Sequence, residues 1–386
     1  MRGPGIAAGN SAVTSLDAIR AELHSGLVGF SALEPAWRDL NTREASPSYS
    51  TSYDWHNALL RHRLDDPEAV VFVVLLSGTQ CVAIVPLQPA TSAHWKWRPL
   101  RPWSVPIDLH ASTYDFPVAA EIVKTFPWFA MWAALARTPR PPRALLVSRN
   151  PDESNCAVAV GSSGTRAYAE PGGSSCFFDC RESHEQIASR YSSRLRKSLK
   201  RGRNKLAQVA AHQFEEFAEG IALDDALESF LELESSGWKG ASGTGSSIAL
   251  DPRTKAFYQS LFNGTQPRLG AHIRLLSVQG KAIAAQLCLQ FGGTRTVLKI
   301  AYDEAHAGLS PGQVLMDYTI ESACRNPLVE CLSLVTGAAW MREWEPKHVR
   351  CQEQWLLSNA PASGYAALMR TVSAAKGAVE RLVNHG

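Results

Sequence analysis

The feature that most constrains the fold is a set of three β-rich runs separated by tight glycine turns. The runs are His272–Val278, Ala282–Phe291 and Thr296–Tyr302, and the turns are Gln279-Gly280 and Gly292-Gly293. β-Branched and large apolar residues favour strands, and short turns with glycine connect antiparallel neighbours. The pattern therefore predicts a three-stranded antiparallel meander.

A helix and a further strand are predicted directly after the meander. Pro311 fits the first helical position, Ser310 precedes it as an N-cap, and Gln313 completes a capping box. This helix should end near Cys324, and a strand is expected around Leu332–Val335. The order predicts an α/β (α+β) fold, with a mixed, largely antiparallel sheet flanked by helices.

The N-terminal half shows a weaker copy of the same order. Residues 33–63 hold two helical stretches, and Val70–Leu76 with Cys81–Leu87 predict a hairpin. A helix over Pro117–Ala136 and a strand over Ala144–Ser148 follow. We therefore predict two tandem units of the same kind, without a residue-level repeat.

The length of the chain agrees with two domains. Its 386 residues match the common size of about 100–200 residues per domain. Residues 149–175 are rich in glycine and serine, which predicts a connector. We expect a flexible N-terminus over 1–24, an N-terminal domain over 25–175 and a C-terminal domain over 176–386.

A basic helix is predicted at the start of the second domain, over Glu185–Val209. Ser183 is its N-cap and Gln186 completes a capping box. Cations recur along it from Arg190 to Lys205, and no acid occurs between Gln186 and Gln213. Such a face attracts phosphate in CoA, RNA, a nucleotide-sugar or an anionic membrane, although a solvated charged helix has the same pattern.

The turn before the second helix is a candidate anion site. Gly308 and Gly312 flank it, and Gly312 leaves the first backbone N–H groups of the helix uncovered. Bare amides and the helix macrodipole favour a pyrophosphate at such a position. A well-capped helix without any ligand has the same local sequence.

The chain resembles a known family from about Leu231 to Trp344. The ordered matches are Glu234–Gly240, Phe257-Tyr258, Ile283–Leu287, Lys299–Gln313, Thr336-Gly337, Trp340 and Trp344. They resemble the GNAT acetyltransferases of the CelD-like group, which is associated with cellulose biosynthesis. The group is similar to Fem-type transferases, which carry two GNAT units. The usual Arg/Gln-x-x-Gly-x-Gly/Ala loop is absent here, and Gly308–Gly312 takes its place.

The resemblance implies an N-acyltransferase. The donor would be acetyl-CoA or another acyl-CoA, and the acceptor a primary amine, such as an amino sugar of polysaccharide or cell-envelope metabolism. The strand Thr296–Tyr302 would hold the thioester. The implied donor-binding residues are Lys299, Ile300, Gly308, Ser310, Gly312 and Gln313.

Roles in proton transfer and acceptor binding follow from the chemistry. Tyr302 is a candidate acid for the leaving thiol, and Asp303 or Glu234 a candidate base. The same residues also suit a packing aromatic, a loop cap and a solvated helix end. The candidate acceptor-binding residues are Trp238, Lys239, Gln286 and Trp340.

Other classes of protein fit the sequence less well. The longest apolar stretch, Phe126–Ala136, is too short to span a bilayer, so we expect a cytoplasmic chain without a transmembrane segment. Cys176, Cys180 and His184 lack a second ligand pair, so no metal is expected. Two alternatives stay open: a Fem-like transferase that uses aminoacyl-tRNA, and a non-catalytic component of a polysaccharide-synthesis complex.

Overall fold

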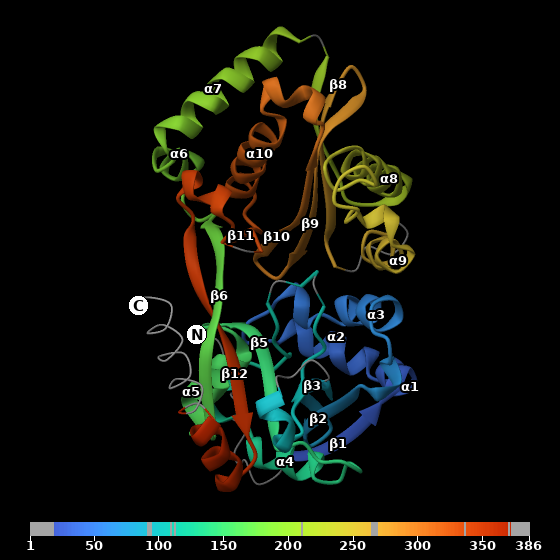
Figure 1. Ribbon diagram of the computed structural model, residues 1–386, viewed down its shortest axis with the longest axis vertical. Coiled ribbons are helices and arrows are strands. Elements are labelled where there is room, and N and C mark those ends of the chain that lie inside the picture. Colours follow the sequence, from blue (N-terminus) through green and yellow to red (C-terminus); the bar gives the residue numbers. More distant parts are fainter. Residues whose placement is uncertain are drawn as a thin grey trace, which may run out of the picture.

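The computed structural model describes residues 19–90, 95–108, 110–111, 113–209, 211–263, 269–335, 337–369 and 371. Within these residues the strands form one mixed sheet, in the order β1-β2-β3-β4-β5-β12-β6-β11-β10-β9-β8-β7. Helices cover both faces of this sheet (Figure 1). The fold class predicted from the sequence is confirmed, with the two halves joined edge to edge.

The N-terminal unit contains the first five strands and their helices. Its elements are β1 (Ile19–Ser25), α1 (Gly26–Ala32), α2 (Glu34–Thr42), α3 (Tyr53–His62), β2 (Val71–Ser77), β3 (Gln80–Pro89), β4 (Trp103–Ser104), η5 (Val123–Thr125), α4 (Trp128–Leu135), β5 (Ala144–Pro151) and α5 (Asn155–Ser163).

The C-terminal unit follows. Its elements are β6 (Ala167–Asp179), α6 (His184–Ser189), α7 (Ser193–Gln208), β7 (His212–Phe217), α8 (Gly220–Ser236), η6 (Ile248–Leu250), α9 (Pro252–Leu261), β8 (Ala271–Val278), β9 (Lys281–Phe291), β10 (Thr294–Tyr302), η7 (Glu304–Leu309), α10 (Pro311–Arg325), β11 (Cys331–Ser333), η8 (Ala339–Trp344) and β12 (Lys347–Leu357).

The two halves of the sheet repeat one topology. Read inward from its edge, the first half runs β1-β2-β3-β4-β5-β12 and the second runs β7-β8-β9-β10-β11-β6. In both halves the first three pairings are antiparallel, the fourth is parallel and the fifth is antiparallel. The duplication expected from element order is therefore visible in the strand directions.

Two long strands, β6 and β12, join the units. β6 follows α5 of the N-terminal unit and pairs with β11, and β12 follows η8 of the C-terminal unit and pairs with β5. β6 and β12 also pair with each other along most of their length. Residues 149–175 are therefore no connector, because they contain α5 and most of β6, and the predicted boundary at 175/176 falls inside a strand.

The hydrophobic core has two main parts. One cluster continues from the N-terminal unit to the α8–α9 face of the C-terminal unit, where Trp55 meets Phe257 edge-on at 5.1 Å between ring centroids. The second lies on the opposite face, beneath α6, α7 and α10. Because the first cluster contains residues of both units, the two units pack as one body.

Local predictions had mixed outcomes. The meander, the hairpin and the start of α10 at Pro311 are confirmed. The segment predicted as flexible over 1–24 includes β1 from Ile19 onward, and residues 1–18 lie outside the described residues. The helix expected over Pro117–Ala136 is only α4, preceded by η5.

The basic helix is divided in two. The capping box of Ser183 and Gln186 is confirmed at the start of α6. The helix then ends at Ser189, and Ser192 caps α7 by accepting a hydrogen bond from the Leu195 amide. A second serine N-cap inside the periodic run restarts the helix, which periodicity alone does not reveal.

Candidate functional site

β10 and β11 separate after a short parallel contact. Their pairing covers only Thr294–Thr296 against Cys331–Ser333. On its other side β10 stays paired with β9 as far as Tyr302, with a bulge between Val297 and Lys299. Among the described residues, the last part of β10 therefore has no strand partner on the β11 side, and its backbone groups there are available to an extended ligand.

The turn between β10 and α10 presents free amides. Ser310 adopts the left-handed conformation, with φ of 51°, and its side chain makes no cap hydrogen bond. Pro311 has no N–H, and within the described chain no acceptor is found for the amides of Gly312 and Gln313. A helix start of this kind binds anions.

α7 lies along one flank of this turn. The Ser198 hydroxyl donates to Gln313 Oε1 at 2.6 Å, and the Lys205 ammonium donates to the carbonyl of Gly308 at 2.9 Å. Gly202 is so close that a Cβ there would lie 2.6 Å from the carbonyl oxygen of Leu309. The predicted capping box of Ser310 and Gln313 is therefore wrong, because Gln313 binds α7 instead.

The turn is not closed on its other sides. Gly308 is exposed, while Ser310, Gly312 and Gln313 are half-buried. The nearest neighbour of a Cβ at Gly312 would be the side chain of Tyr302, at 3.5 Å. The amides are accordingly flanked by α7 without being buried beneath it.

A small pocket lies beside the end of β10. It has a volume of about 120 Å³, and Glu234, Trp238, Lys239, Ile300 and Tyr302 contribute to its lining. Five residues selected from the sequence for three different roles thus meet at one place. Tyr302 links this pocket to the turn, since it is 42% exposed and its ring also faces Gly312.

Glu234 fixes the glycine-rich loop that follows α8. Its carboxylate accepts hydrogen bonds from the Lys239 ammonium at 2.8 Å and from the Ile248 amide at 2.9 Å, although the residue is only 4% exposed. Trp238 stays 57% exposed, with the Lys239 ammonium 5.8 Å from its ring centroid. Trp238 therefore projects from an anchored loop and does not fold into the core.

Asp303 caps its own loop. It accepts hydrogen bonds from the Ala305 amide at 2.9 Å and from His306 at 3.0 Å. Burial raises the pKa of this carboxyl, but these two hydrogen bonds and the nearby charges outweigh it, and the pKa is lowered overall. With its oxygens already engaged, Asp303 is placed as a structural cap.

Lys299 faces a polar cluster shared by both units. Its pKa is lowered by burial and then by Lys239, while Glu234 and Asp108 act in the opposite direction. None of these neighbours belongs to the turn 308–313. The structure thus places the Lys299 side chain toward the boundary of the units and away from the candidate anion site.

His110 is a member of this cluster that the sequence did not reveal. Its Nδ1 lies 3.0 Å from the hydroxyl of the buried Tyr258, and burial together with the charge of Lys299 lowers its pKa to about 4. Arg63 joins the units nearby, with contacts to Asp108 at 2.9 Å and Asp251 at 3.0 Å. His110 lies in an irregular segment of the other unit, where no periodicity marks it.

Two predicted acceptor residues lie elsewhere. Gln286 is 1% exposed and accepts a hydrogen bond from the Thr319 hydroxyl at 2.7 Å, inside the core between β9 and α10. Trp340 is 48% exposed on η8, whose buried Met341 and Trp344 pack in the α7–α10 cluster. Neither residue reaches the pocket that contains Trp238.

α7 carries an uneven distribution of charge. Arg203 pairs with the buried Asp317, which also contacts His184, and Arg194 lies 3.5 Å from Glu343. The exposed residues Lys197, Lys200 and Arg201 have no ion pair within the described residues. The outer face of α7 is therefore cationic, while its inner face is fixed on α10.

His184 bonds to Asp317 and not to the neighbouring cysteines. The described residues contain no group of three or more His, Cys, Asp or Glu side chains that could hold a metal ion. The same part of the chain contains no helix long and apolar enough to cross a membrane.

Comparison with known proteins defines the class of the C-terminal unit. Residues 193–345 match the family model described as Acetyltransferase (GNAT) domain. This range begins at α7 and includes the turn and the pocket. The chain therefore carries a GNAT-type acetyltransferase domain.

Solved structures extend the likeness to both units. The chain is similar to FemX, with a TM-score of 0.58 at 8% identity over 84% of this chain and 96% of that one. It is also similar to L-PGS from Bacillus licheniformis, with a TM-score of 0.51 at 10% identity over 84% and 92%. At these identities the likeness concerns the fold alone. No curated protein matches the sequence.

Proposed function

We propose that this protein is an N-acyltransferase that moves an acyl group, most simply acetyl, from acyl-CoA to a primary amine. The observation that carries the proposal is the separation of β10 from β11 next to a helix start with two free amides. An open strand edge suits an extended thioester, and the helix start suits a pyrophosphate. The GNAT-type domain supports the same chemistry.

The donor would follow β10 toward the turn. The amides of Gly312 and Gln313 would bind the pyrophosphate, with Gly308 and the Ser310 hydroxyl beside them. The acyl carbonyl would lie along Lys299 and Ile300, where backbone N–H groups can stabilise the oxyanion as negative charge develops. Lys299 would contribute through its backbone, because its side chain faces the other unit.

Acid and base would both come from the pocket. The amine nitrogen attacks the thioester carbon, the C–S bond breaks, and the thiolate takes a proton from Tyr302. The proton lost by the amine goes to Glu234, directly or through water. Glu234 is the better candidate than Asp303, because Glu234 lines the pocket with Tyr302 and Asp303 is not among the lining residues.

The acceptor would enter beside Trp238 and Lys239. An exposed indole next to an ammonium suits a sugar ring, which stacks on aromatic faces and bears several hydroxyl acceptors. An amino sugar of polysaccharide or cell-envelope metabolism agrees with the CelD-like resemblance of this segment. Gln286 and Trp340 are left out of the acceptor site by their positions.

A thiol-release assay with acetyl-CoA and a panel of amines tests the proposal. Gly312→Glu places a carboxylate at the amides and should lower kcat/KM at least about 100-fold, while calorimetry with CoA should lose its heat of binding. Gly161→Glu is the matched control, because Gly161 has open space around it on α5. Full activity in Gly312→Glu would remove the donor placement. A wild-type chain without CoA binding would instead support a non-catalytic GNAT-fold component.

A second candidate rests on the outer face of α7. Lys197, Lys200 and Arg201, which form no ion pair with the described residues, make a cationic row on α7 beside the turn, and this row suits the phosphates of an RNA-borne donor. RNA binding should then fall steeply with salt, and Lys200→Gln with Arg201→Gln should reduce the slope by about 2. Absence of RNA retention at low salt would leave acyl-CoA as the donor.

A further inference from the structure

α4 is a helix without a polar side chain. Its sequence, Trp-Phe-Ala-Met-Trp-Ala-Ala-Leu, is apolar on every side. A helix of this composition is normally buried all round. Here only the inner side is buried, through Met131, Ala134 and Leu135, whereas Ala133 is exposed and Phe129 is 87% exposed.

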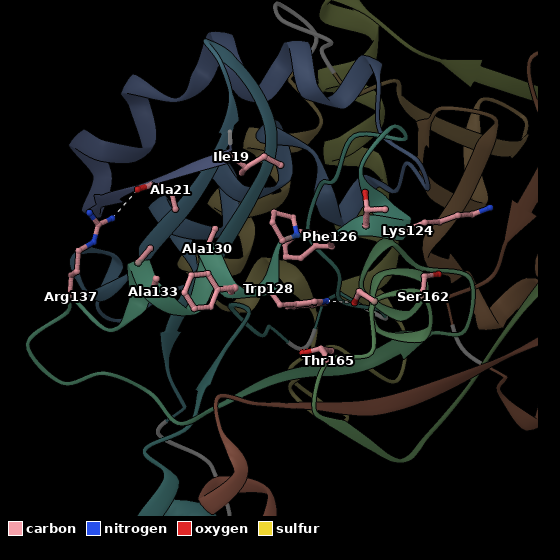
Figure 2. Close-up of a pocket in the computed structure, with 15 residues that line it drawn as sticks. Ile19, Ala21, Lys124, Phe126, Trp128, Ala130, Ala133, Arg137, Ser162 and Thr165 are labelled. Carbon is pink, nitrogen blue, oxygen red and sulfur yellow. Dashed lines mark hydrogen bonds between the residues drawn. The ribbon is translucent and has the colours of Figure 1, made fainter. Parts of the chain in front are cut away.

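A groove runs along the uncovered side of α4. Its volume is about 900 Å³, and Figure 2 shows it between α4, the start of β1 and the end of α5. Ile19, Phe129, Ala130 and Ala133 contribute to its lining, as do Phe126 and Trp128, which are themselves buried. The 87% exposed ring of Phe129 beside this groove makes the α4 face a candidate contact surface.

Cations flank the groove. Arg137 and Lys124 lie on opposite sides of the apolar side chains in Figure 2. Arg140 and Arg143, just beyond α4, are exposed. Within the described residues none of these four cations forms an ion pair, and the nearby Glu121 is paired with Arg43. The rim therefore has a net positive charge.

The corresponding helix in the other unit is covered. α10 occupies the same place in the topology as α4, and α7 packs over it through Leu199, Gly202 and Leu206. α4 has no covering helix among the described residues. The open groove is thus a difference between the two copies and is not imposed by the shared topology.

We propose that the α4 face of the N-terminal unit binds the surface of an anionic lipid bilayer. Phe129 and the groove would take acyl chains, and Lys124 and Arg137 would meet lipid phosphates. An exposed aromatic ring on an apolar helix face, together with a basic rim, favours interfacial membrane binding. A protein partner of matching charge would have to supply acids, whereas an anionic bilayer supplies both the apolar interior and the charge.

This arrangement leaves the acyltransferase site free. α4 and α7 lie at opposite ends of the long axis of the molecule (Figure 1). The donor turn beneath α7 would therefore face away from the bilayer. Membrane binding is independent of the proposed chemistry, and activity in solution should not require lipid.

Co-sedimentation of the full chain with vesicles tests the proposal. The probes are vesicles of phosphatidylcholine alone and of phosphatidylcholine mixed with phosphatidylglycerol. We expect binding to the anionic vesicles, and at least about tenfold weaker binding for Phe129→Ser. Leu328→Ser is the matched control, because Leu328 is also an exposed apolar residue, at 71%, and lies far along the chain from α4.

A charge comparison completes the test. Lys124→Gln with Arg137→Gln should weaken binding to anionic vesicles by about fivefold per charge, whereas Lys200→Gln with Arg201→Gln on α7 should leave it unchanged. Loss of binding only in the α7 variant would overturn the proposal, as would no retention of the wild-type chain. A dimer that Phe129→Ser dissociates, without vesicle binding, would assign the face to a second copy instead.

Discussion

The two units share a sheet topology but differ after the fourth strand. In the C-terminal unit, β10 has nine residues and leads through a short turn into the 15-residue α10. In the N-terminal unit, β4 has two residues, and an eight-residue helix begins only at Trp128. Between them His110 contacts Tyr258 of the other unit, and Asp108 binds Arg63, which also contacts Asp251 there. One copy of the fold thus has a turn with free amides at this position, and the other has contacts that join the units.

Three acids of the two units differ in the direction of their pKa shifts. In the N-terminal unit, burial raises the pKa of Glu44 to about 8 and that of Asp115 to about 7. In the C-terminal unit, burial also opposes ionisation of Glu216, but His272, Arg274 and Arg295 outweigh it and lower its pKa to about 2. Glu44 and Asp115 therefore favour the protonated form, whereas neighbouring cations keep Glu216 ionised.

The largest expected effect is on kcat, and it tests which of the two units carries the activity. Tyr302→Phe should lower kcat by about 10²-fold or more, because it removes the proposed acid, while the exposed position leaves stability unchanged. Tyr114→Phe is the matched change in the N-terminal unit, where the hydroxyl is hydrogen-bonded to the Asp108 backbone. It should cost about 1–2 kcal/mol of unfolding free energy and leave kcat unaltered. Equal loss of kcat in both variants would contradict the division of roles.

Glu44 and Glu216 should respond to pH in opposite directions. The folded pKa of Glu44 lies above its unfolded value of 4.5, so its contribution to stability is full below about pH 4.5 and is lost as pH rises toward 8. Glu44→Gln should therefore leave the free energy of unfolding nearly unchanged at pH 5. At pH 8 it should raise that free energy by a few kcal/mol at most. Urea unfolding at the two pH values measures the difference.

Glu216→Gln provides the opposite case. The folded pKa of Glu216 lies below 4.5, so its contribution is present above about pH 4.5 and is lost as pH falls toward 2. At pH 7 the variant leaves Arg274 and Arg295 without their carboxylate and should destabilise the chain by about 3 kcal/mol. A stabilising effect at pH 7 would mean that the arginines do not depend on Glu216.

Regular segments of the fold could be read from the sequence. The meander and the start of α10 follow from apolar runs, glycine turns and a proline, which act over a few residues. The exchange of β6 and β12 could not be predicted in this way, because pairing across the units leaves no local signal. Glycine and serine in residues 149–175 indicated a connector, but β12 supplies the hydrogen bonds that make part of this segment a strand.

The candidate site shows the same limit. One pocket brings together five residues that sequence motifs predict, because α8 packs against β10. They are Glu234, Trp238, Lys239, Ile300 and Tyr302. Gln286 was selected with them, yet strand alternation turns its side chain toward α10. The sequence does not reveal His110, because it contacts Tyr258 across the boundary of the units, and such contacts depend on how the units pack.

The smallest expected effects come from two glycine substitutions, which should change the free energy of unfolding in opposite directions. A Cβ at Gly202 would lie 2.6 Å from the carbonyl oxygen of Leu309 and 2.9 Å from Val314, so Gly202→Ala should push α7 from the turn. We expect a loss of about 1–3 kcal/mol of unfolding free energy and a rise in KM for the donor. Gly161, inside α5 of the other unit, has no neighbour within 4 Å, so Gly161→Ala should gain about 0.5–1 kcal/mol through helix propensity alone. Urea unfolding and steady-state kinetics measure both variants. If Gly202→Ala were stabilised and its KM unchanged, α7 would not position the donor turn. The packing of α7 over α10 would then contribute no more to catalysis than the α4 face does.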